Sequence, residues 1–480
     1  MNSRASAFVG ASAFLLMALA TADWQSLAYD ELFTVWVASQ PWSDLIPQAN
    51  LDGFTPPSFY ALIKLATLFG LRNEGLRLVP VAFGAMAVFL GIEAARRRFG
   101  RRGALISFLV IPSSSYVFTF SHELRPYSAL LAFGMAFLGC LGGEPSNRKD
   151  HLALVAAFVG SLFSYLGLFM VALWMFEARA RISRRRLLAV ATGASALALP
   201  ALLKVAAIKS HGAPGIPNWT NGLSPSSILF GLAPAPFDGR LAAALIAALV
   251  VALLLAASLT AGFRSGRISA EGLLVRACVL WSVMVAVIDG AVPIGFAPRY
   301  FVLPMAAFLL LLAGRFACMR RLGVALALLV AAGNLISTSR YLTRVPAARE
   351  DWRQALARVQ TQVGSDGVVL AFPFHHGAVA ASAYAPRLKV GGGYTSRSGP
   401  VYWYEPPTLF RGYSFEDLRP IQDVRASFGR VASESNVCLL SDEPDPAKTA
   451  GVFDAFAQLD RVSVLDAGDP RIRILCRSKV

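Results

Sequence analysis

The sequence has few charged residues and few cysteines, and each shortage excludes a class of protein. Only 15% of its 480 residues are charged, against about 25% in an average soluble domain. A single soluble core stops growing beyond roughly 250–300 residues, so a chain with 55% hydrophobic residues needs a membrane to bury them. The five cysteines include no C-x-x-C pair and no spacing with histidine that is typical of a zinc site.

The basic excess of +16 argues for topology rather than for a nucleic-acid partner. Residues 1–339 carry 27 Lys and Arg against 14 Asp and Glu, whereas residues 340–480 carry 18 against 15. The excess therefore belongs to the apolar part of the chain. A nucleic-acid-binding protein would gather its bases on a soluble face instead.

Eleven apolar stretches recur between polar breaks, several of them shorter than the roughly 20 residues of a membrane-spanning helix. They lie at 5–22, 78–95, 103–120, 126–142, 151–165, 167–178, 187–207, 240–262, 276–292, 299–314 and 322–338. Ser164 and Gly167 are the only break between the fifth and the sixth. We therefore expect a polytopic all-α membrane domain over residues 1–339, with about eleven spans.

Basic residues gather in alternate loops, and this sets the orientation. The clusters are Arg96, Arg97, Arg98, Arg101 and Arg102; Arg148 and Lys149; Arg179, Arg181, Arg184, Arg185 and Arg186; Arg264 and Arg267; and Arg315, Arg320 and Arg321. Short loops rich in Lys and Arg stay in the cytoplasm, so the other loops and the C-terminal segment lie outside. The first stretch is interpreted as an uncleaved signal anchor, with a cleaved signal peptide as the alternative.

The first outer loop, residues 23–77, is too long for a connector and too apolar for a disordered segment. Apolar residues at helical spacing between Leu32 and Val37, and again in Pro57–Gly70, predict two juxtamembrane helices at the headgroup boundary. A short re-entrant span at 57–70 is the alternative. Between the two helices, Asp52 opens a proline-rich turn that leads to Tyr60.

After Ser339 the composition becomes that of a soluble domain. We expect strands at 367–372, 436–441 and 471–476, with helices at about 349–363 and 446–459. Strands that alternate with helices indicate a small α/β domain over residues 340–480. Cys438 and Cys476 lie in two of these strands and would form a disulfide if the strands adjoin.

Two other features of this domain are not assigned a catalytic or ligand-binding role. His375 and His376 are read as a strand-end loop rather than as a metal site. Gly391–Gly393 is not a phosphate loop, because no G-K-[ST] follows it.

Asp30 and Glu31 follow Tyr29 just beyond the first span. Adjacent carboxylates repel each other at the membrane surface, where the dielectric constant is low. A pair there therefore suggests a catalytic role, such as general base for an attacking hydroxyl or amine. The alternative is structural, with Asp30 as the N-cap of the helix that follows.

A second polar group stands in residues 121–127 (SHELRPY), at the outer end of another span. His122, Glu123, Arg125 and Tyr127 lie within six residues between hydrophobic helices, where ionisable groups indicate a functional site. A simple pair between Glu123 and Arg125 is the alternative.

Four bases stand alone at the outer ends of spans: Arg77, Lys204, Lys209 and Arg299. Each taken singly fits a snorkelling side chain. As a set they lie at a depth that suits a lipid phosphate, which Arg contacts in bidentate fashion and Lys as a point charge.

In this order the motifs resemble those of the GT-C membrane glycosyltransferases, in the branch of the protein O-mannosyltransferases and lipid A aminoarabinose transferases. The resemblance rests on YDE (29–31), TPPSFY (55–60) for H-P-P-L-Y-Y, HELRPY (122–127) for the end of S-Q-E-A-R-P-Y, PRY (298–300) and WR (352–353) for D-W-R. Thr55, His122 and Leu124 replace the usual His, Gln and Ala, which puts the identity of the sugar in doubt.

The resemblance implies the inverting transfer of a sugar from a polyprenyl-phosphate donor to an envelope lipid, glycan or protein. The reaction would occur on the periplasmic face of the bacterial cytoplasmic membrane, with no cofactor required and no metal ion indicated. Asp30 matches the catalytic base, with Glu31 assisting. Substrate contacts fall on Tyr29, Tyr60, His122, Glu123, Arg125 and Tyr127. The resemblance assigns lipid-phosphate contacts to Arg299 and Tyr300. Arg77, Lys204 and Lys209 are added to them because of their predicted depth in the membrane.

Other classes of function stay open at this point. A lipid-linked polysaccharide polymerase or ligase, or a non-enzymatic transporter of lipid-linked sugars, would share the membrane domain. A transporter favours internal repeats and ionisable residues inside spans, but the sequence has no repeat and only Asp289 approaches such a position. A family member with a structural or regulatory role is the third reading.

Overall fold

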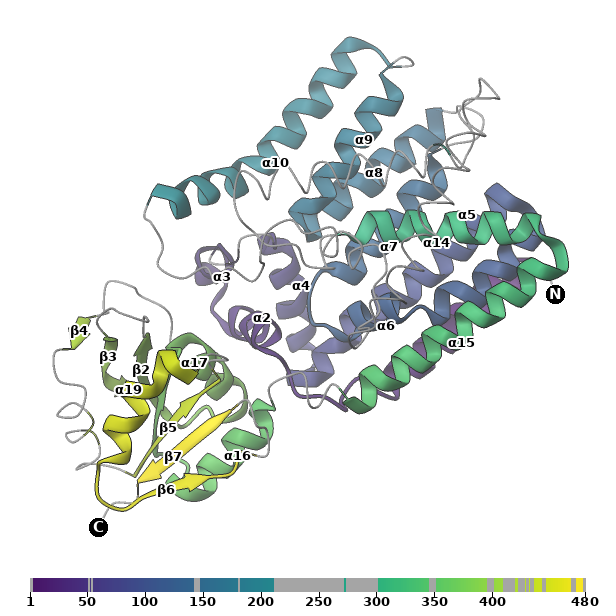
Figure 1. Ribbon diagram of the computed structural model, residues 1–480. Coiled ribbons are helices and arrows are strands. Elements are labelled where there is room, and N and C mark those ends of the chain that lie inside the picture. Colours follow the sequence, from purple (N-terminus) through teal and green to yellow (C-terminus); the bar gives the residue numbers. More distant parts are fainter. Residues whose placement is uncertain are drawn as a thin grey trace. The chain divides into compact units, whose positions relative to one another are not determined.

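In the computed structural model the chain is mostly helical, with one small sheet (Figure 1). The structure describes residues 3–50, 52, 55–141, 147–179, 182–210, 272, 301–344, 351–394, 401–408, 419–421, 428, 431, 436–442, 446–467 and 472–477. The apolar stretches at 240–262 and 276–292 lie outside them, so the number of spans stays a prediction.

Contacts divide the chain into two compact units. The helical unit comprises Met1–Ala22, Pro41–Phe69 and Leu76–Tyr341, and the sheet unit comprises Asp23–Gln40, Gly70–Gly75 and Leu342–Val480. The change of composition near residue 340 falls beside this last boundary. Composition gives no sign that Asp23–Gln40 groups with the sheet, and the sequence predicts this segment as part of the membrane domain.

The helices of the helical unit follow the apolar stretches of the sequence. They are α1 (Ser3–Leu19), α3 (Trp42–Ala49), α4 (Pro57–Leu68), α5 (Leu78–Ser113), α6 (Ser115–His122), α7 (Tyr127–Cys140), α8 (Asn147–Phe163), α9 (Leu168–Ala178), α10 (Arg184–Ser210), α14 (Val302–Cys318) and α15 (Arg320–Arg344), with the short helix η2 (Tyr165–Gly167). A further short helix, η1 (Asn73–Arg77), crosses the boundary between the units.

Helix α5 is a hairpin of two legs rather than one long helix. Gly100 interrupts it at φ 70° and ψ −159°, a backbone conformation open to glycine. Beyond this turn the chain runs back, so that Gly91 packs against Ile111. The arginine cluster 96–102 flanks the turn, as the alternation of spans and basic loops predicts.

Two further breaks separate helices in this unit. Ser164 and Gly167 divide α8 from α9 as predicted, and the Trp174 indole donates to the Asp150 carbonyl at 2.9 Å because α9 returns along α8. The stretch 103–120, expected as one span, is broken at Ser114, where α5 ends and α6 begins.

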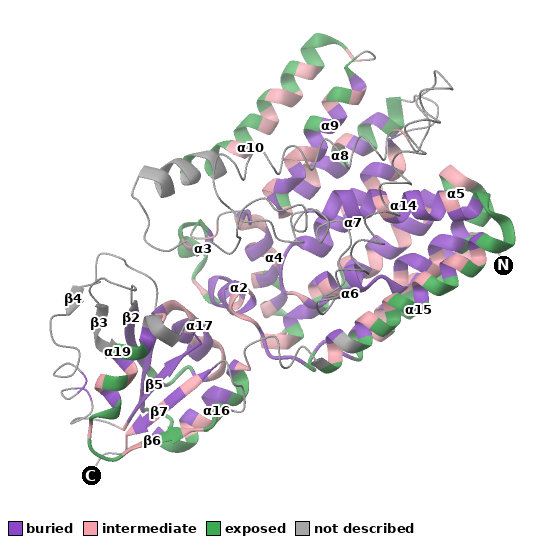
Figure 2. Ribbon diagram, in the orientation of Figure 1, coloured by how far each residue is buried: buried purple, intermediate pink, exposed green. Residues whose placement is uncertain are grey.

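By length and composition, two helical segments among the described residues are long and apolar enough to cross a membrane: Asn73–Ser113, which contains both legs of the hairpin, and Arg320–Thr343. Four apolar helices of 10–17 residues accompany them: Ala5–Leu19, Tyr127–Cys140, Tyr165–Ala178 and Val302–Cys318. Helices α7 and α14 are buried along most of their length, whereas α15 is largely exposed (Figure 2). The exposed side chains of α15 include Leu322, Leu328, Leu329 and Ile336, a surface that suits lipid rather than water.

The first outer loop contains α3 and α4 and the helix α2 (Tyr29–Ser39), one helix more than predicted. Helix α4 buries Phe59, Tyr60 and Ile63 and exposes Leu65 and Leu68, the amphipathic pattern expected at a headgroup boundary. Helix α2 differs from that expectation, because it belongs to the sheet unit and seven of its eleven residues are buried.

The sheet unit contains a seven-stranded sheet in the order β4-β3-β2-β1-β5-β7-β6. The strands are β1 (Val368–Ala371), β2 (Lys389–Tyr394), β3 (Val401–Thr408), β4 (Arg419–Ile421), β5 (Val437–Ser441), β6 (Val462–Leu465) and β7 (Arg473–Arg477), with helices α16 (Trp352–Val363), α17 (Phe374–Tyr384) and α19 (Pro446–Ala457). Strand β1 pairs in parallel with β2 and β5, and the other pairs are antiparallel. The predicted strands correspond to β1, β5 and β7.

Alternate residues of the central strands face opposite layers. Val368, Leu370, Val437 and Leu439 pack with Val452 and Phe456 of α19. On the other face, Ala371 and Leu440 meet Gly377 of α17 so closely that a side chain at Gly377 would overlap Ala371. The sheet therefore lies between α19 and α17.

Cys438 and Cys476 are direct partners in the pairing of β5 with β7 and are joined by a disulfide. This is the pairing expected if the two strands adjoin. Cys140 and Cys318 are free, and Cys278 lies outside the described residues.

Candidate functional site

The acidic pair lies in the first turn of α2, where the Glu31 carboxylate turns back to the helix N-terminus. Ala28, not Asp30, holds the N-cap position, so the interpretation of Asp30 as a cap is wrong. The Ala28 amide donates to Oε2 of Glu31 at 3.0 Å, and Glu31 is only 2% exposed. Asp30 is half-buried. Glu31 thus fixes the start of the helix, and negative charge there is stabilised by the helix dipole.

Tyr29, which precedes the pair, stacks on a histidine of the sheet unit. Its ring centroid lies 4.1 Å from that of His376 and 5.1 Å from that of His375. These histidines occupy the first turn of α17, so the expectation of a strand-end loop is wrong. Nδ1 of His376 lies 2.6 Å from Oδ2 of Asp442. A hydrogen bond from the imidazole to this carboxylate oxygen makes Nδ1 the donor of the pair.

A second polar cluster is centred on Asp52 in the helical unit. The Arg125 guanidinium lies 2.7 Å from Oδ2 of Asp52, and their side chains are 8% and 12% exposed. The Tyr60 hydroxyl donates to the same oxygen at 2.6 Å. Burial, and then the negative charge of Asp52, raise the pKa of Tyr60 well above its ordinary value, so the phenol stays protonated. Asp52 is a residue for which the sequence had suggested only a turn.

The other residues of the 121–127 motif lie where α6 gives way to α7. His122 is buried, stacks on Phe118 and joins its Nε2 to the Thr21 hydroxyl at 2.8 Å. Glu123 is half-buried, outside either helix. Tyr127 begins α7 and packs edge-on against Phe120 at 5.3 Å. The motif therefore ties the end of α6 to the segment that follows α1.

The bases proposed for a lipid phosphate have different surroundings. Arg77 is 1% exposed and donates to the Ala22 carbonyl at 2.9 Å. Its position at the end of a predicted span could not reveal this structural hydrogen bond. Lys204 and Lys209 lie on α10, and the structure describes their backbone only. Arg299 and Tyr300 lie outside the described residues.

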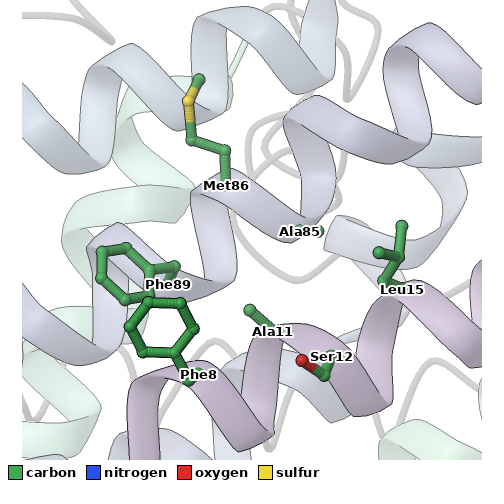
Figure 3. Close-up of a pocket in the computed structure, with 7 residues that line it drawn as sticks. All are labelled: Phe8, Ala11, Ser12, Leu15, Ala85, Met86 and Phe89. Carbon is green, nitrogen blue, oxygen red and sulfur yellow. The ribbon is translucent and has the colours of Figure 1, made fainter. Parts of the chain in front are cut away.

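Neither of two cavities in the described chain brings titratable groups together. A depression of about 330 Å³ between α1 and α5 is lined by Phe8, Ala11, Ser12, Leu15, Ala85, Met86 and Phe89, with the rings of Phe8 and Phe89 in edge-to-face contact (Figure 3). A smaller one in the sheet unit, of about 200 Å³, lies among Trp36, Ser39, Gln40, Ser382 and nearby apolar residues. Within the described residues, no group of three or more His, Cys, Asp or Glu is placed to hold a metal ion.

Comparison with solved structures identifies the fold. ArnT from Cupriavidus metallidurans in the apo state matches with a TM-score of 0.56 and 15% identity, over 98% of this chain and 97% of that chain. The same enzyme bound to undecaprenyl phosphate matches with a TM-score of 0.57 and 14% identity over the same shares. No protein-family model matches the chain, and no curated protein matches it in sequence.

ArnT is a lipid A aminoarabinose transferase of the GT-C type, so the chain has the GT-C fold of membrane glycosyltransferases. The fold, with the apolar helices described above, supports a membrane location.

Proposed function

We propose that this protein is a membrane glycosyltransferase that moves a sugar from a polyprenyl-phosphate donor to an envelope acceptor. The proposal rests on one observation above all. A chain with the fold of ArnT carries an acidic pair at the start of a helix soon after its first apolar helix, with Glu31 held by a backbone amide. The ArnT crystal structure with undecaprenyl phosphate supports a polyprenyl-linked donor.

Asp30 is the general base of this proposal. Its carboxylate takes the proton of the acceptor hydroxyl or amine while the acceptor lone pair forms a bond to C1 of the sugar. The bond between C1 and the phosphate oxygen breaks, and its electron pair leaves with polyprenyl phosphate. One displacement inverts the anomeric carbon, and it requires one base and no covalent nucleophile.

Negative charge develops on the leaving phosphate, so cations beside it stabilise the transition state. Arg77 already donates a hydrogen bond to the Ala22 carbonyl, and Arg125 already forms an ion pair with Asp52. We therefore assign phosphate contact to Arg299, with Tyr300, Lys204 and Lys209, and keep Arg77 and Arg125 as residues that shape the fold around the donor. The arginine-flanked turn of α5 supports a cytoplasmic position for that end of the helical unit, and we assign the reaction to the opposite, periplasmic face.

The test is the Asp30→Asn variant, reconstituted in proteoliposomes and supplied with polyprenyl-phosphate sugars and envelope acceptors extracted from the same membranes. Release of polyprenyl phosphate should fall by about 10²–10⁴-fold, the contribution of a general base, while undecaprenyl phosphate binding is retained. Asp23→Asn is the matched control, because Asp23 is an exposed acid on the same segment. Turnover that survives Asp30→Asn would exclude this role, and movement of intact donor across the bilayer would indicate a transporter.

A further inference from the structure

The carboxyl ends of β1 and β5 form a place where α/β sheets bind ligands. The two strands are parallel neighbours, yet β1 leads into α17 on one face of the sheet and β5 leads toward α19 on the other. Connections that leave adjacent strands toward opposite faces open a crevice at the strand ends, and ligands of open α/β sheets bind there.

In this protein, a segment of the same unit contacts the residues at those strand ends. His375 and His376 follow β1, Asp442 follows β5, and the pair His376–Asp442 joins the two strand ends at 2.6 Å. The ring of Tyr29 lies against both histidines. The residue before the acidic pair therefore stands where a separate ligand would otherwise bind.

A second set of bonds holds the same segment at the other end of α17. The Leu27 amide donates to the Tyr384 hydroxyl at 2.9 Å, and that hydroxyl donates to Oε1 of Glu74 at 2.9 Å. Arg353 of α16 lies 3.5 Å from the same carboxylate oxygen. Leu27 and Tyr29 are thus attached to opposite ends of one eleven-residue helix.

We propose that α17 is a clamp that fixes the beginning of α2, with His376 and Tyr384 as positioning residues for the Asp30 carboxylate. The inference rests on the proposed function, since it assigns the sheet unit a part in that reaction. A base acts only when its carboxylate is held close to the productive geometry, and a displacement of 1 Å costs about 100-fold in rate. Attachment at both Leu27 and Tyr29 restricts rotation and sliding of the first turn of α2.

The experiment is hydrogen exchange of the full-length protein in nanodiscs, read over residues 27–39, for Tyr384→Phe and His376→Ala. Each variant removes a contact of the clamp and leaves the sheet register unchanged. We expect those amides to exchange about tenfold faster, the effect of one lost hydrogen bond in Tyr384→Phe and of one lost ring contact in His376→Ala, while strands β1, β5 and β7 keep their protection. Thr361→Ala is the control for loss of a hydroxyl, because Thr361 bonds only its own helix, at Ala357. His151→Ala is the control for loss of an exposed imidazole.

Turnover of the same variants gives the second readout. We expect kcat to fall by about 10- to 100-fold while KM for the donor is unchanged. Wild-type exchange over residues 27–39 in both variants would show that the clamp does not exist, whether or not the protein is a transferase. Faster exchange with unchanged kcat would overturn the positioning role. A wild-type protein that transfers no sugar would refute the proposed function, while the exchange data would still decide the clamp.

Discussion

The pair formed by Arg125 and Asp52 allows a quantitative test of what holds the helical unit together. Arg125→Gln removes a guanidinium that lies 2.7 Å from a carboxylate, with both side chains almost excluded from water. Loss of one partner of a buried ion pair costs about 3–5 kcal/mol, because the other charge stays buried without its counter-ion. We expect the free energy of unfolding in detergent micelles, measured by steric trapping, to fall by that amount.

The matched control is Arg97→Gln, since Arg97 also pairs with a carboxylate, Glu93 at 2.8 Å, but its side chain is 58% exposed. An exposed pair contributes about 0–1 kcal/mol. The double variant Asp52→Asn with Arg125→Gln should cost less than the sum of its two single variants, because neither charge is then left alone. If the two costs instead add within about 0.5 kcal/mol, the limit for independent sites, the pair is not coupled and the reasoning fails.

Two further predictions concern the sheet unit. Replacing both Cys438 and Cys476 with serine opens a loop of sequence separation 38, so the chain-entropy model gives a loss of about 4 kcal/mol in the free energy of unfolding. Thermal unfolding of the wild-type protein and the double variant, with and without reductant, measures this loss. Equal stability of the two proteins without reductant would contradict it. Burial, and then the neighbouring His376, lower the pKa of His375 well below its ordinary value. The unfolded chain therefore binds the proton first, and stability should fall as the pH drops below about 6.5 toward the folded pKa. His375→Gln should flatten this slope between pH 7.5 and 5.5, and an unchanged slope would rule His375 out as its source.

Hydropathy was sufficient to predict much of the helical unit, because a span must be apolar along its whole length. The break at Ser164 and Gly167 was also visible, since small and polar residues interrupt the apolar run there. The break at Ser114 was not, because Ser113, Ser114 and Ser115 stand between residues that continue the pattern. A serine that bonds a nearby backbone group can end a helix without any change in mean hydropathy, as Ser114 does with the Val117 amide.

The candidate site was predictable only where it is local in sequence. Tyr29, Asp30 and Glu31 are adjacent, so their shared position at a helix start follows from the motif. Asp52 and Arg125 meet through tertiary packing, and a pair between Glu123 and Arg125 was the alternative that sequence spacing offered. His376 was read as a loop because its helix has no polar N-cap residue; Pro373 holds that position.

Composition distinguishes residues 340–480 from the rest because the share of charged and apolar residues reflects whether a segment is exposed to water or to lipid. It does not show which segments are in contact. Asp23–Gln40 directly follows the first apolar stretch of the sequence, yet its contacts group it with the sheet unit. Helix α2, which carries the acidic pair, and the C-terminal domain therefore belong to one compact unit. Since Leu27 and Tyr29 are attached to opposite ends of α17, a shift of that helix moves both attachment points together. Substitutions on the far side of the sheet that tilt α17 should therefore change turnover through Asp30, although they touch neither donor nor acceptor.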